Sequence, residues 1–252
     1  MAKNKFSEIY EVLKEEILDG KYTSNMMLPT ELQLIERFSC SRNTVRRAIS
    51  QLNTEGYVQS IKGKGVVVLE NSCSNDFFLN MHNFKGVESI VEDKKVNTAT
   101  SVLHFSKILI DNKLSKKTGF KVGSEVYYLH RLRYIDNIPK ILDINYFLCS
   151  IVKDLDVSIA QGSIYKYIEE CLGTKIVSSR KIFKIEKATE LELKTLPLND
   201  YNCVGVIKNS VYTDDGKLFE YTESKHTPET FVFMDVTQKI LKISLINIIF
   251  YV

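Results

Sequence analysis

The sequence lacks the residue patterns that mark metal sites and disulfide scaffolds. Its five cysteines are scattered and never form a CxxC pair, which argues against both zinc ligation and a disulfide framework and fits a reducing cytoplasm. Its four histidines form no HExxH or similar cluster. We therefore expect a protein without a metal site and without a bound cofactor.

Long apolar runs are also missing. The most apolar segment, residues 243–252, has only ten residues, and these include a serine and an asparagine. A helix that crosses the hydrocarbon core of a bilayer needs roughly 20 residues, so we expect no membrane span. The segment Met-Ala-Lys-Asn-Lys (residues 1–5) leads directly into a polar, amphipathic pattern. No signal peptide is therefore expected, and the cytoplasm is the expected location.

Positive charge is nearly balanced by negative charge over the whole chain but not locally. The formal net charge is +3, whereas residues 37–64 hold six basic residues against one acidic residue, Glu55. The segment just before, residues 8–19, carries five acidic side chains. A local concentration of positive charge is what contact with phosphate groups requires, although such a run is also compatible with a solvated face.

Three segments in the first 55 residues show apolar side chains at helical spacing. The first covers residues 6–17 and ends at an Asp-Gly pair. In the second, Thr30 and Gln33 have the spacing of a capping box, and Glu31 suits the positive end of a helix. Ser41 is a candidate N-cap for the third. The buried side of that helix is predicted to consist of Val45, Ala48, Ile49 and Leu52.

The predicted third helix has a polar face that suits the DNA major groove. A helical wheel places four polar residues opposite the apolar side, namely Asn43, Arg46, Arg47 and Ser50, with Arg42 and Thr44 in the first turn. Two helices joined by a tight turn, the second exposing arginines near its N-terminus, form the helix-turn-helix arrangement. An arginine can donate two hydrogen bonds to guanine or to a phosphate. The alternative is a surface helix whose arginines are only solvated.

A predicted β-hairpin follows this helix. Gly56 stands where a helix C-cap is expected, and residues 57–61 and 66–69 read as strands around a Lys-Gly-Lys-Gly turn. Gly63 and Gly65 allow the backbone to approach a sugar-phosphate rail closely and place Lys64 within reach of the minor groove. A basic hairpin directly after a basic helix indicates a wing.

The motifs LPTELQLIERF (residues 28–38), CSRNTVRRA (40–48), GYV (56–58) and GKG (63–65) together resemble the DNA-binding domain of GntR-type transcription regulators. The resemblance runs without a break over residues 5–69 and implies a winged helix-turn-helix that binds double-stranded operator DNA. It implies DNA contacts from Thr30, Glu31, Arg42, Thr44, Arg46, Arg47, Lys64 and Gly65. The expected helix geometry adds Ser41 and Asn43 to this set.

The rest of the chain is predicted to be α+β with a mainly antiparallel sheet. A polar segment without periodicity separates it from the first domain and reads as a linker. Strands are expected at residues 102–110, 126–135, 140–147, 180–187, 203–212 and 218–225, and helices at 163–172 and 188–193. Residues 123–139 and 196–221 share one pattern, from a helix end through a strand and a turn into a second strand. This recurrence suggests an internal duplication.

Polar residues in this region could form an anion site. Arg131 and Arg133 alternate on one predicted strand, so both guanidinium groups face the same side. Two such charges are costly side by side unless an anion lies between them. Ser163 opens a predicted helix, whose free N–H groups also favour an anion, and Tyr165 follows it. The alternative is that the arginines pair with Glu125 or Asp136 on the surface.

Residues 77–235 resemble the effector-binding (UTRA) domain found in the HutC branch of the GntR-type regulators, a domain similar in fold to chorismate lyase. Within that branch the chain looks most like repressors of trehalose utilisation. The resemblance implies effector contacts from Ser89, Arg131, Arg133, Asp143, Ser163, Tyr165 and Glu220, with Asp143 standing where related chains often have glutamate. Asp143, Glu220 and Tyr221 lie on predicted strands and are expected to hydrogen-bond sugar hydroxyls.

The predicted protein is a homodimeric repressor of a sugar-utilisation operon, relieved by a phosphosugar such as trehalose 6-phosphate. Three alternatives stay open: another effector such as an amino-sugar 6-phosphate, a chorismate-lyase-like enzyme fused to a DNA-binding head, and a second domain that only dimerises. No Ser–His–Asp set or carboxylate pair supports an enzyme. The expected organisation is a DNA-binding domain (1–69), a linker (70–76), a UTRA domain for effector binding and dimerisation (77–238), and an apolar tail (239–252).

Overall fold

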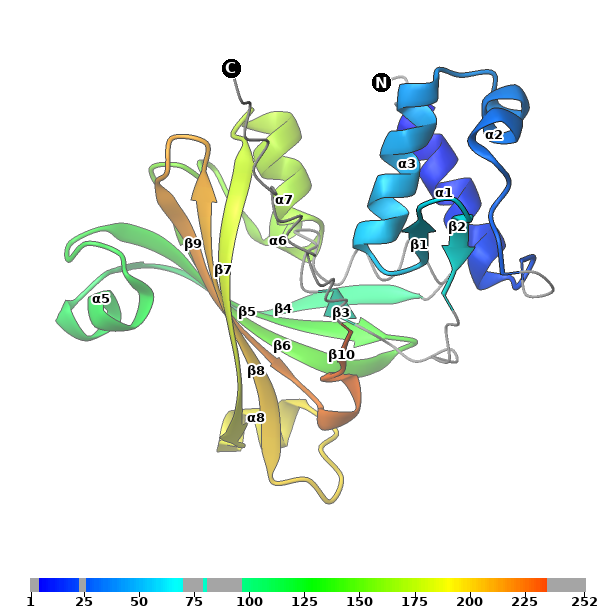
Figure 1. Ribbon diagram of the computed structural model, residues 1–252. Coiled ribbons are helices and arrows are strands. Elements are labelled where there is room, and N and C mark those ends of the chain that lie inside the picture. Colours follow the sequence, from blue (N-terminus) through cyan, green and yellow to red (C-terminus); the bar gives the residue numbers. More distant parts are fainter. Residues whose placement is uncertain (1–4, 23–25, 70–78, 81–96, 235–252) are drawn as a thin grey trace, which may run out of the picture. The chain divides into compact units, whose positions relative to one another are not determined.

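A computed structural model describes residues 5–22, 26–69, 79–80 and 97–234 of the chain. The chain divides into two compact units, one that contains the described residues up to 69 and one that contains those from 79 onward. Figure 1 shows the first unit in blue to cyan and the second from teal through green to orange. Ser89 and the apolar tail lie outside the described residues.

The first unit is a three-helix domain followed by a two-stranded hairpin (Figure 1). Its elements are α1 (Lys5–Leu18), α2 (Glu31–Phe38), α3 (Arg42–Thr54), β1 (Val58–Ile61) and β2 (Gly65–Val68). The buried core draws on all of them and includes the predicted stripe of α3, Val45, Ala48, Ile49 and Leu52. The strands pair antiparallel, with Val58 opposite Val68. The predicted helices and hairpin are therefore confirmed.

Local side-chain chemistry sets where α2 and α3 begin. Thr30 caps α2 through a capping box in which its backbone N–H donates to Gln33 Oε1 at 2.9 Å. Ser41 caps α3 by accepting a hydrogen bond from the N–H of Thr44. These caps set the first residues of α2 and α3, and Ser39, with a positive φ of 48°, ends α2 just before Ser41.

The second unit is built on one antiparallel six-stranded sheet, which confirms the α+β prediction (Figure 1). Its strands are β4 (Thr98–Leu109), β5 (Glu125–Ile135), β6 (Ile138–Leu148), β7 (Ile176–Lys187), β8 (Cys203–Thr213) and β9 (Leu218–His226). They lie in the order β4-β5-β6-β9-β8-β7. Asp136 and Asn137 both adopt positive φ, as the two-residue hairpin between β5 and β6 requires.

The strand order reflects two similar halves. The half β4-β5-β6 carries α5 (Asn112–Thr118) between its first two strands, and the half β7-β8-β9 carries α8 (Glu190–Thr195) in the same place. The halves meet where β6 pairs with β9 in the middle of the sheet. This arrangement matches the duplication that the sequence suggests.

Short helices cover both faces of the sheet. Residues of α6 (Val157–Gln161) and α7 (Ile164–Lys166) pack on the face that bears Leu129 and Phe147, which we call the inner face. Residues next to α5 and in or next to α8 pack on the opposite, outer face. Two further short strands, β3 (Leu79–Asn80) and β10 (Phe233–Met234), pair parallel.

The region predicted as one helix over residues 163–172 is more irregular than expected. After the single turn of α7, the chain continues as a π-helix over Tyr167–Cys171. Gly173 then adopts a positive φ and ends the segment, as expected. The predicted helix at 188–193 also begins later, because Thr189 and Glu192 form a capping box that starts it at Glu190.

Candidate functional site

The first candidate site is the exposed face of α3. Arg46 Nε donates to Glu31 Oε1 at 2.9 Å, and Arg42 Nε lies 3.8 Å from Glu31 Oε2. Both guanidinium groups are exposed, so the carboxylate orients them without withdrawing them from solvent. Glu31 therefore aligns two cations along the start of α3, a contact between helices that sequence reasoning did not identify.

Other predicted DNA-contacting residues divide into exposed side chains and caps. Asn43 and Arg47 are exposed on α3. The Arg47 guanidinium lies 4.6 Å from the centre of the Phe6 ring on α1, a cation–π contact that restrains it. The hydroxyls of Ser41 and Thr44 lie 2.9 Å apart, and Thr30 is occupied by its capping box. The three hydroxyl residues thus shape the helix starts.

The turn between β1 and β2 presents Lys64 at its tip. Lys64 is exposed and stands between two glycines with positive φ, +78° at Gly63 and +118° at Gly65. A side chain at either glycine would be strained, because L-residues rarely adopt these conformations. Lys64 is consequently held on a tight turn of the hairpin that follows α3 in the same domain.

The second candidate site lies on the inner face of the sheet. Register places Arg131 on β5 opposite Asp143 on β6, and Asp143 opposite Ser224 on β9. Arg133 Nε donates to Asp143 Oδ2 at 2.5 Å, Arg131 Nη2 lies 3.6 Å from the same oxygen, and Ser224 donates to Oδ1 at 2.5 Å. The anion between the two arginines is thus Asp143, and neither Glu125 nor Asp136 takes that place.

The environments of Arg131 and Arg133 differ sharply. Arg131 is 4% exposed and donates to Asn145 Oδ1 at 3.0 Å and to the Ala160 carbonyl at 3.4 Å. Burial and then Arg133 lower the pKa of Arg131 to about 10, which leaves it charged at neutral pH. Arg133 is partly exposed. Arg131 is therefore buried inside the site, whereas Arg133 lies at its surface.

Arg133 lines an open pocket of roughly 190 Å³. The remaining lining residues come from β4, from β5 and from the connection of α6 to α7: Thr98, Ala99, Thr100, Tyr134, Gln161, Gly162 and Ser163. Ser163 is the N-cap of α7 and accepts a hydrogen bond from the N–H of Lys166. A guanidinium and a helix start thus face one small space, a combination that suits an oxyanion.

Burial governs the protonation of the carboxyls on the inner face. Burial opposes the ionisation of Asp143, but Arg133, Arg131 and Ser224 outweigh it, and the pKa of Asp143 is lowered. Burial raises the pKa of Glu220, whose Oε1 accepts a hydrogen bond from Thr222 at 2.6 Å. Burial and Glu220 raise the pKa of Tyr165 well above its ordinary range. Asp143 is the firmly ionised member of this set.

Sequence reasoning missed the residues that complete this network. Asn145 on β6 and Thr222 on β9 join Arg131 to Glu220, because Asn145 Nδ2 donates to Thr222 Oγ1 at 2.8 Å. Both residues lie two positions from a predicted site residue on the same strand, so the two-residue period of a strand could have identified them. Ser89, the remaining predicted contact, lies outside the described residues.

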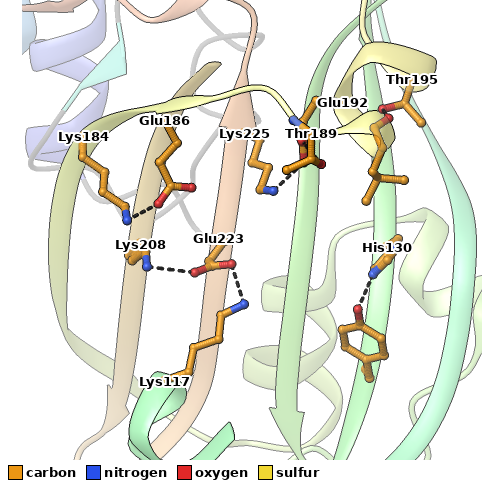
Figure 2. A network of polar contacts seen from close by, with 12 residues as sticks. Lys117, His130, Lys184, Glu186, Thr189, Glu192, Thr195, Lys208, Glu223 and Lys225 are labelled. Atoms are coloured by element: carbon orange, nitrogen blue, oxygen red, sulfur yellow. Dashed lines mark hydrogen bonds and ion pairs between the residues drawn. The ribbon is translucent and has the colours of Figure 1, made fainter. Parts of the chain in front are cut away.

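The outer face of the same sheet carries a separate polar network (Figure 2). Glu223 accepts ion pairs from Lys117 at 2.7 Å and from Lys208 at 3.1 Å, and Lys225 pairs with Glu192 of α8. Figure 2 also shows His130 bonded to a neighbouring tyrosine, Tyr128, at 2.6 Å. Strand β9 therefore contributes alternate residues to two polar networks, one on each face.

Two negative findings apply to the part of the chain that the structure describes. None of its helices is long and apolar enough to cross a membrane. No group of three or more histidine, cysteine, aspartate or glutamate side chains among these residues could hold a metal ion.

Two family profiles match the chain, one in each of its two compact units. The profile of the gntR family of bacterial regulatory proteins matches residues 5–68, and that of the UTRA domain matches residues 93–232. Together these matches span most of both compact units.

Curated relatives match along almost the whole chain. The HTH-type transcriptional regulator TreR of Bacillus subtilis is 32% identical over 239 residues, which cover 95% of this chain and 99% of the relative. The transcriptional repressor NagR of the same organism is 26% identical and covers 91% of this chain and 93% of its own length. The mannosyl-D-glycerate system repressor MngR of Escherichia coli is 27% identical, with 93% and 96% covered.

Solved structures show the same fold. The possible transcriptional regulator YydK of Bacillus subtilis covers 94% of this chain and 100% of its own with a TM-score of 0.75, at 21% identity. The effector-binding domain of the Bacillus subtilis trehalose repressor is 31% identical, with a TM-score of 0.52, and covers 57% of this chain and 99% of its own.

Proposed function

The chain belongs to the GntR family of bacterial regulatory proteins with a UTRA domain, and from this premise we propose that a phosphosugar releases it from its operator. It is a DNA-binding transcription regulator, and the relatives NagR and MngR are named as repressors, MngR of a mannosyl-D-glycerate transport and metabolism system. Trehalose 6-phosphate is the effector we favour, because the regulator TreR is the relative that matches at 32% identity along nearly the whole chain.

The pocket lined by Arg133 and Ser163 carries this proposal. A guanidinium offers two parallel N–H donors to a phosphate, and the helical turn that Ser163 opens offers a hydroxyl and backbone N–H groups. Asp143 is shared by two neighbouring guanidinium groups, of which Arg133 is the one that lines the pocket. We assign phosphate binding to Arg133 and Ser163, and assign Ser89, Arg131, Asp143, Tyr165 and Glu220 to the rest of the effector site.

We assign operator binding to α3 and the wing. Arg42, Asn43, Arg46 and Arg47 are exposed on α3 and Lys64 is exposed on the hairpin, while Thr30, Glu31, Ser41, Thr44 and Gly65 hold these elements in place. A homodimer would place two such helices one duplex turn apart, roughly 34–36 Å. The proposed limits are 1–69 for the DNA-binding domain, 70–76 for the linker and 77–238 for the effector and dimerisation domain.

Release of DNA requires that the effector bind the two states of the protein with different affinity. The test is fluorescence anisotropy of a palindromic duplex from the chain's own upstream region, titrated with trehalose 6-phosphate at fixed salt. Release is expected for the natural chain and is expected to be lost in Arg133→Ala. The matched control is Lys217→Ala on the exposed β8–β9 turn, which should respond like the natural chain.

Other outcomes of this titration would change the assignment. An amino-sugar 6-phosphate that releases the duplex at lower concentration than trehalose 6-phosphate would replace it as the effector. DNA binding that no sugar phosphate alters would refute the effector proposal and leave the second domain as a dimerisation module. Chemical conversion of the added sugar phosphate, followed by chromatography of the mixture, would indicate an enzyme.

A further inference from the structure

His226, the last residue of β9, is a buried polar side chain that has no hydrogen-bond partner among the residues that the structure describes. It is 2% exposed, and neither ring nitrogen has a partner among the described residues. Register places it on the inner face, because it follows Ser224 by two positions and pairs with Ile141 on β6 and Gly205 on β8. His226 therefore shares a sheet face with the two arginines of the effector site.

The charged groups near His226 are already engaged with each other. Asp143 accepts from Arg133 and from Ser224, and these contacts use both of its oxygens. Burial lowers the pKa of His226 to about 4, with Asp143 acting in the opposite direction and Arg133 in the same direction. The imidazole is therefore neutral at physiological pH and offers one N–H donor and one nitrogen acceptor.

Packing against Phe231 explains why an aromatic ring stands at position 226 but does not explain why that ring carries two nitrogens. The imidazole lies 5.8 Å from the centre of the Phe231 ring, which itself packs on the backbone of Gly205. A phenylalanine would fill the same apolar surroundings without burying two polar atoms. Leaving a buried polar group without a hydrogen bond costs about 1–3 kcal/mol. A buried imidazole at this position is therefore explained best by a ligand that hydrogen-bonds to it.

The position of His226 relative to Arg133 suits a sugar phosphate. Both residues pair with Ile141, one from β5 and one from β9. Two strand spacings separate their Cα atoms by about 10 Å, which is on the scale of a phosphorylated sugar. A hydroxyl group both donates and accepts a hydrogen bond, as a neutral imidazole does.

We infer that His226 is a further effector-binding residue, whose neutral imidazole exchanges hydrogen bonds with hydroxyl groups of the sugar while Arg133 holds the phosphate. This inference rests on the proposed function and narrows it, because it assigns the inner face beyond the phosphate to a neutral, hydroxyl-rich part of the ligand. Phe231 acts as a positioning residue that keeps the ring in place.

The test compares ligand affinity with stability in the full chain. Isothermal titration with trehalose 6-phosphate and with inorganic phosphate is combined with thermal unfolding for the natural chain, His226→Phe and His226→Gln. In His226→Phe we expect an unchanged or raised Tm, a roughly tenfold loss of affinity for trehalose 6-phosphate, and unchanged affinity for inorganic phosphate. His226→Gln keeps a donor and an acceptor and should lose less affinity than His226→Phe.

A matched control comes from the other face of the sheet. His130 on β5 bonds Tyr128 and lies on the outer face, so His130→Phe should leave both affinities unchanged. Natural affinity for trehalose 6-phosphate in His226→Phe would overturn the inference and leave the proposed function standing. A lower Tm in His226→Phe, or equal losses for both ligands, would also overturn it. Binding of neither ligand by the natural chain would overturn the proposed function and the inference together.

Discussion

Arg133 donates a short hydrogen bond to Asp143 on the inner face, with 2.5 Å between Nε and Oδ2. The two residues come from neighbouring strands and are not directly opposite, since Asp143 pairs with Arg131. The carboxylate is thus shared by both guanidinium groups, and Ser224 fixes its other oxygen. One buried negative charge therefore orients Arg133 toward the pocket while it compensates Arg131.

Asp143→Asn should destabilise the fold and weaken its acid dependence. Removing one partner of a buried ion pair costs about 3–5 kcal/mol, because the remaining charges stay buried without compensation. The folded-state pKa of Asp143 is below its ordinary value, so its stabilising contribution is complete above about pH 4 and is lost as the pH falls further. Urea unfolding at pH 7 and at pH 3 should show a smaller difference for Asp143→Asn than for the natural chain.

The control for this substitution is Asp215→Asn. Asp215 pairs with Lys217 on an exposed turn, so its removal should change the free energy of unfolding at neutral pH too little to measure. Equal effects of the two substitutions would contradict a special role for the buried carboxylate.

Arg131→Ala and Arg133→Ala should have different consequences. Arg131 is buried and bonded to Asn145 and to the Ala160 carbonyl, so its loss should cost about 3–5 kcal/mol of stability. Arg133 is partly exposed at the pocket, so its loss should mainly reduce affinity for trehalose 6-phosphate. Thermal unfolding and isothermal titration on both variants would separate the roles. A folded Arg133→Ala with natural ligand affinity would remove Arg133 from the proposed site.

Sequence patterns predicted the sheet better than the short helices. The hairpin turns at Asp136-Asn137 and around Gly216 place two strand pairs with little ambiguity, because few residue types tolerate the positive φ found there. Helices α5 and α6 were not predicted, since seven and five residues are too few to show an apolar period. They form where the sheet offers an apolar surface for them to cover.

The site was predictable in its residue types but not in its pairing. Strand alternation correctly placed Arg131 and Arg133 on one face, and the hairpin turn gave β6 as a neighbouring strand, but neither gave the residue that lies opposite each arginine. The partner Asp143 depends on the β5–β6 register, and Ser224 depends on a contact between the two halves of the sheet. His226 carries no sequence signal of its own, because only the structure shows that its ring is buried and that its nitrogens have no partner among the described residues.

Arg46→Ala should weaken operator binding and its salt dependence. A phosphate-contacting arginine releases counterions on binding, so its loss should reduce the slope of log affinity against log salt by about one, at every sequence tested. The control is Arg37→Ala on α2, because Arg37 is held by two bonds to Glu16, at 2.8 and 2.6 Å. Anisotropy titrations at several salt concentrations should show no slope change for Arg37→Ala. Loss of affinity for one duplex only, with an unchanged slope, would instead make Arg46 a base-reading residue.

Gly205→Ala should destabilise the second unit through a single clash. A Cβ at this position would lie 2.0–2.5 Å from three atoms of the Phe231 ring, far inside van der Waals contact. The ring has to move, and overpacking of this kind costs about 1–3 kcal/mol. Gly162→Ala is the matched control, because its Cβ would meet only the Ile159 carbonyl at 3.6 Å, an ordinary contact. Thermal unfolding should show a lower Tm for Gly205→Ala and little change for the control.

A double-mutant cycle can assign that cost to the ring. If the clash with Phe231 is responsible, adding Gly205→Ala to Phe231→Ala should destabilise far less than adding it to the natural chain. Additive effects would mean that Gly205 is required for another reason, such as backbone freedom in β8. Because Phe231 also lies beside His226, Gly205→Ala should reduce affinity for trehalose 6-phosphate more than for inorganic phosphate. Equal losses for both ligands would indicate that the substitution disturbs the whole sheet and not the ring alone.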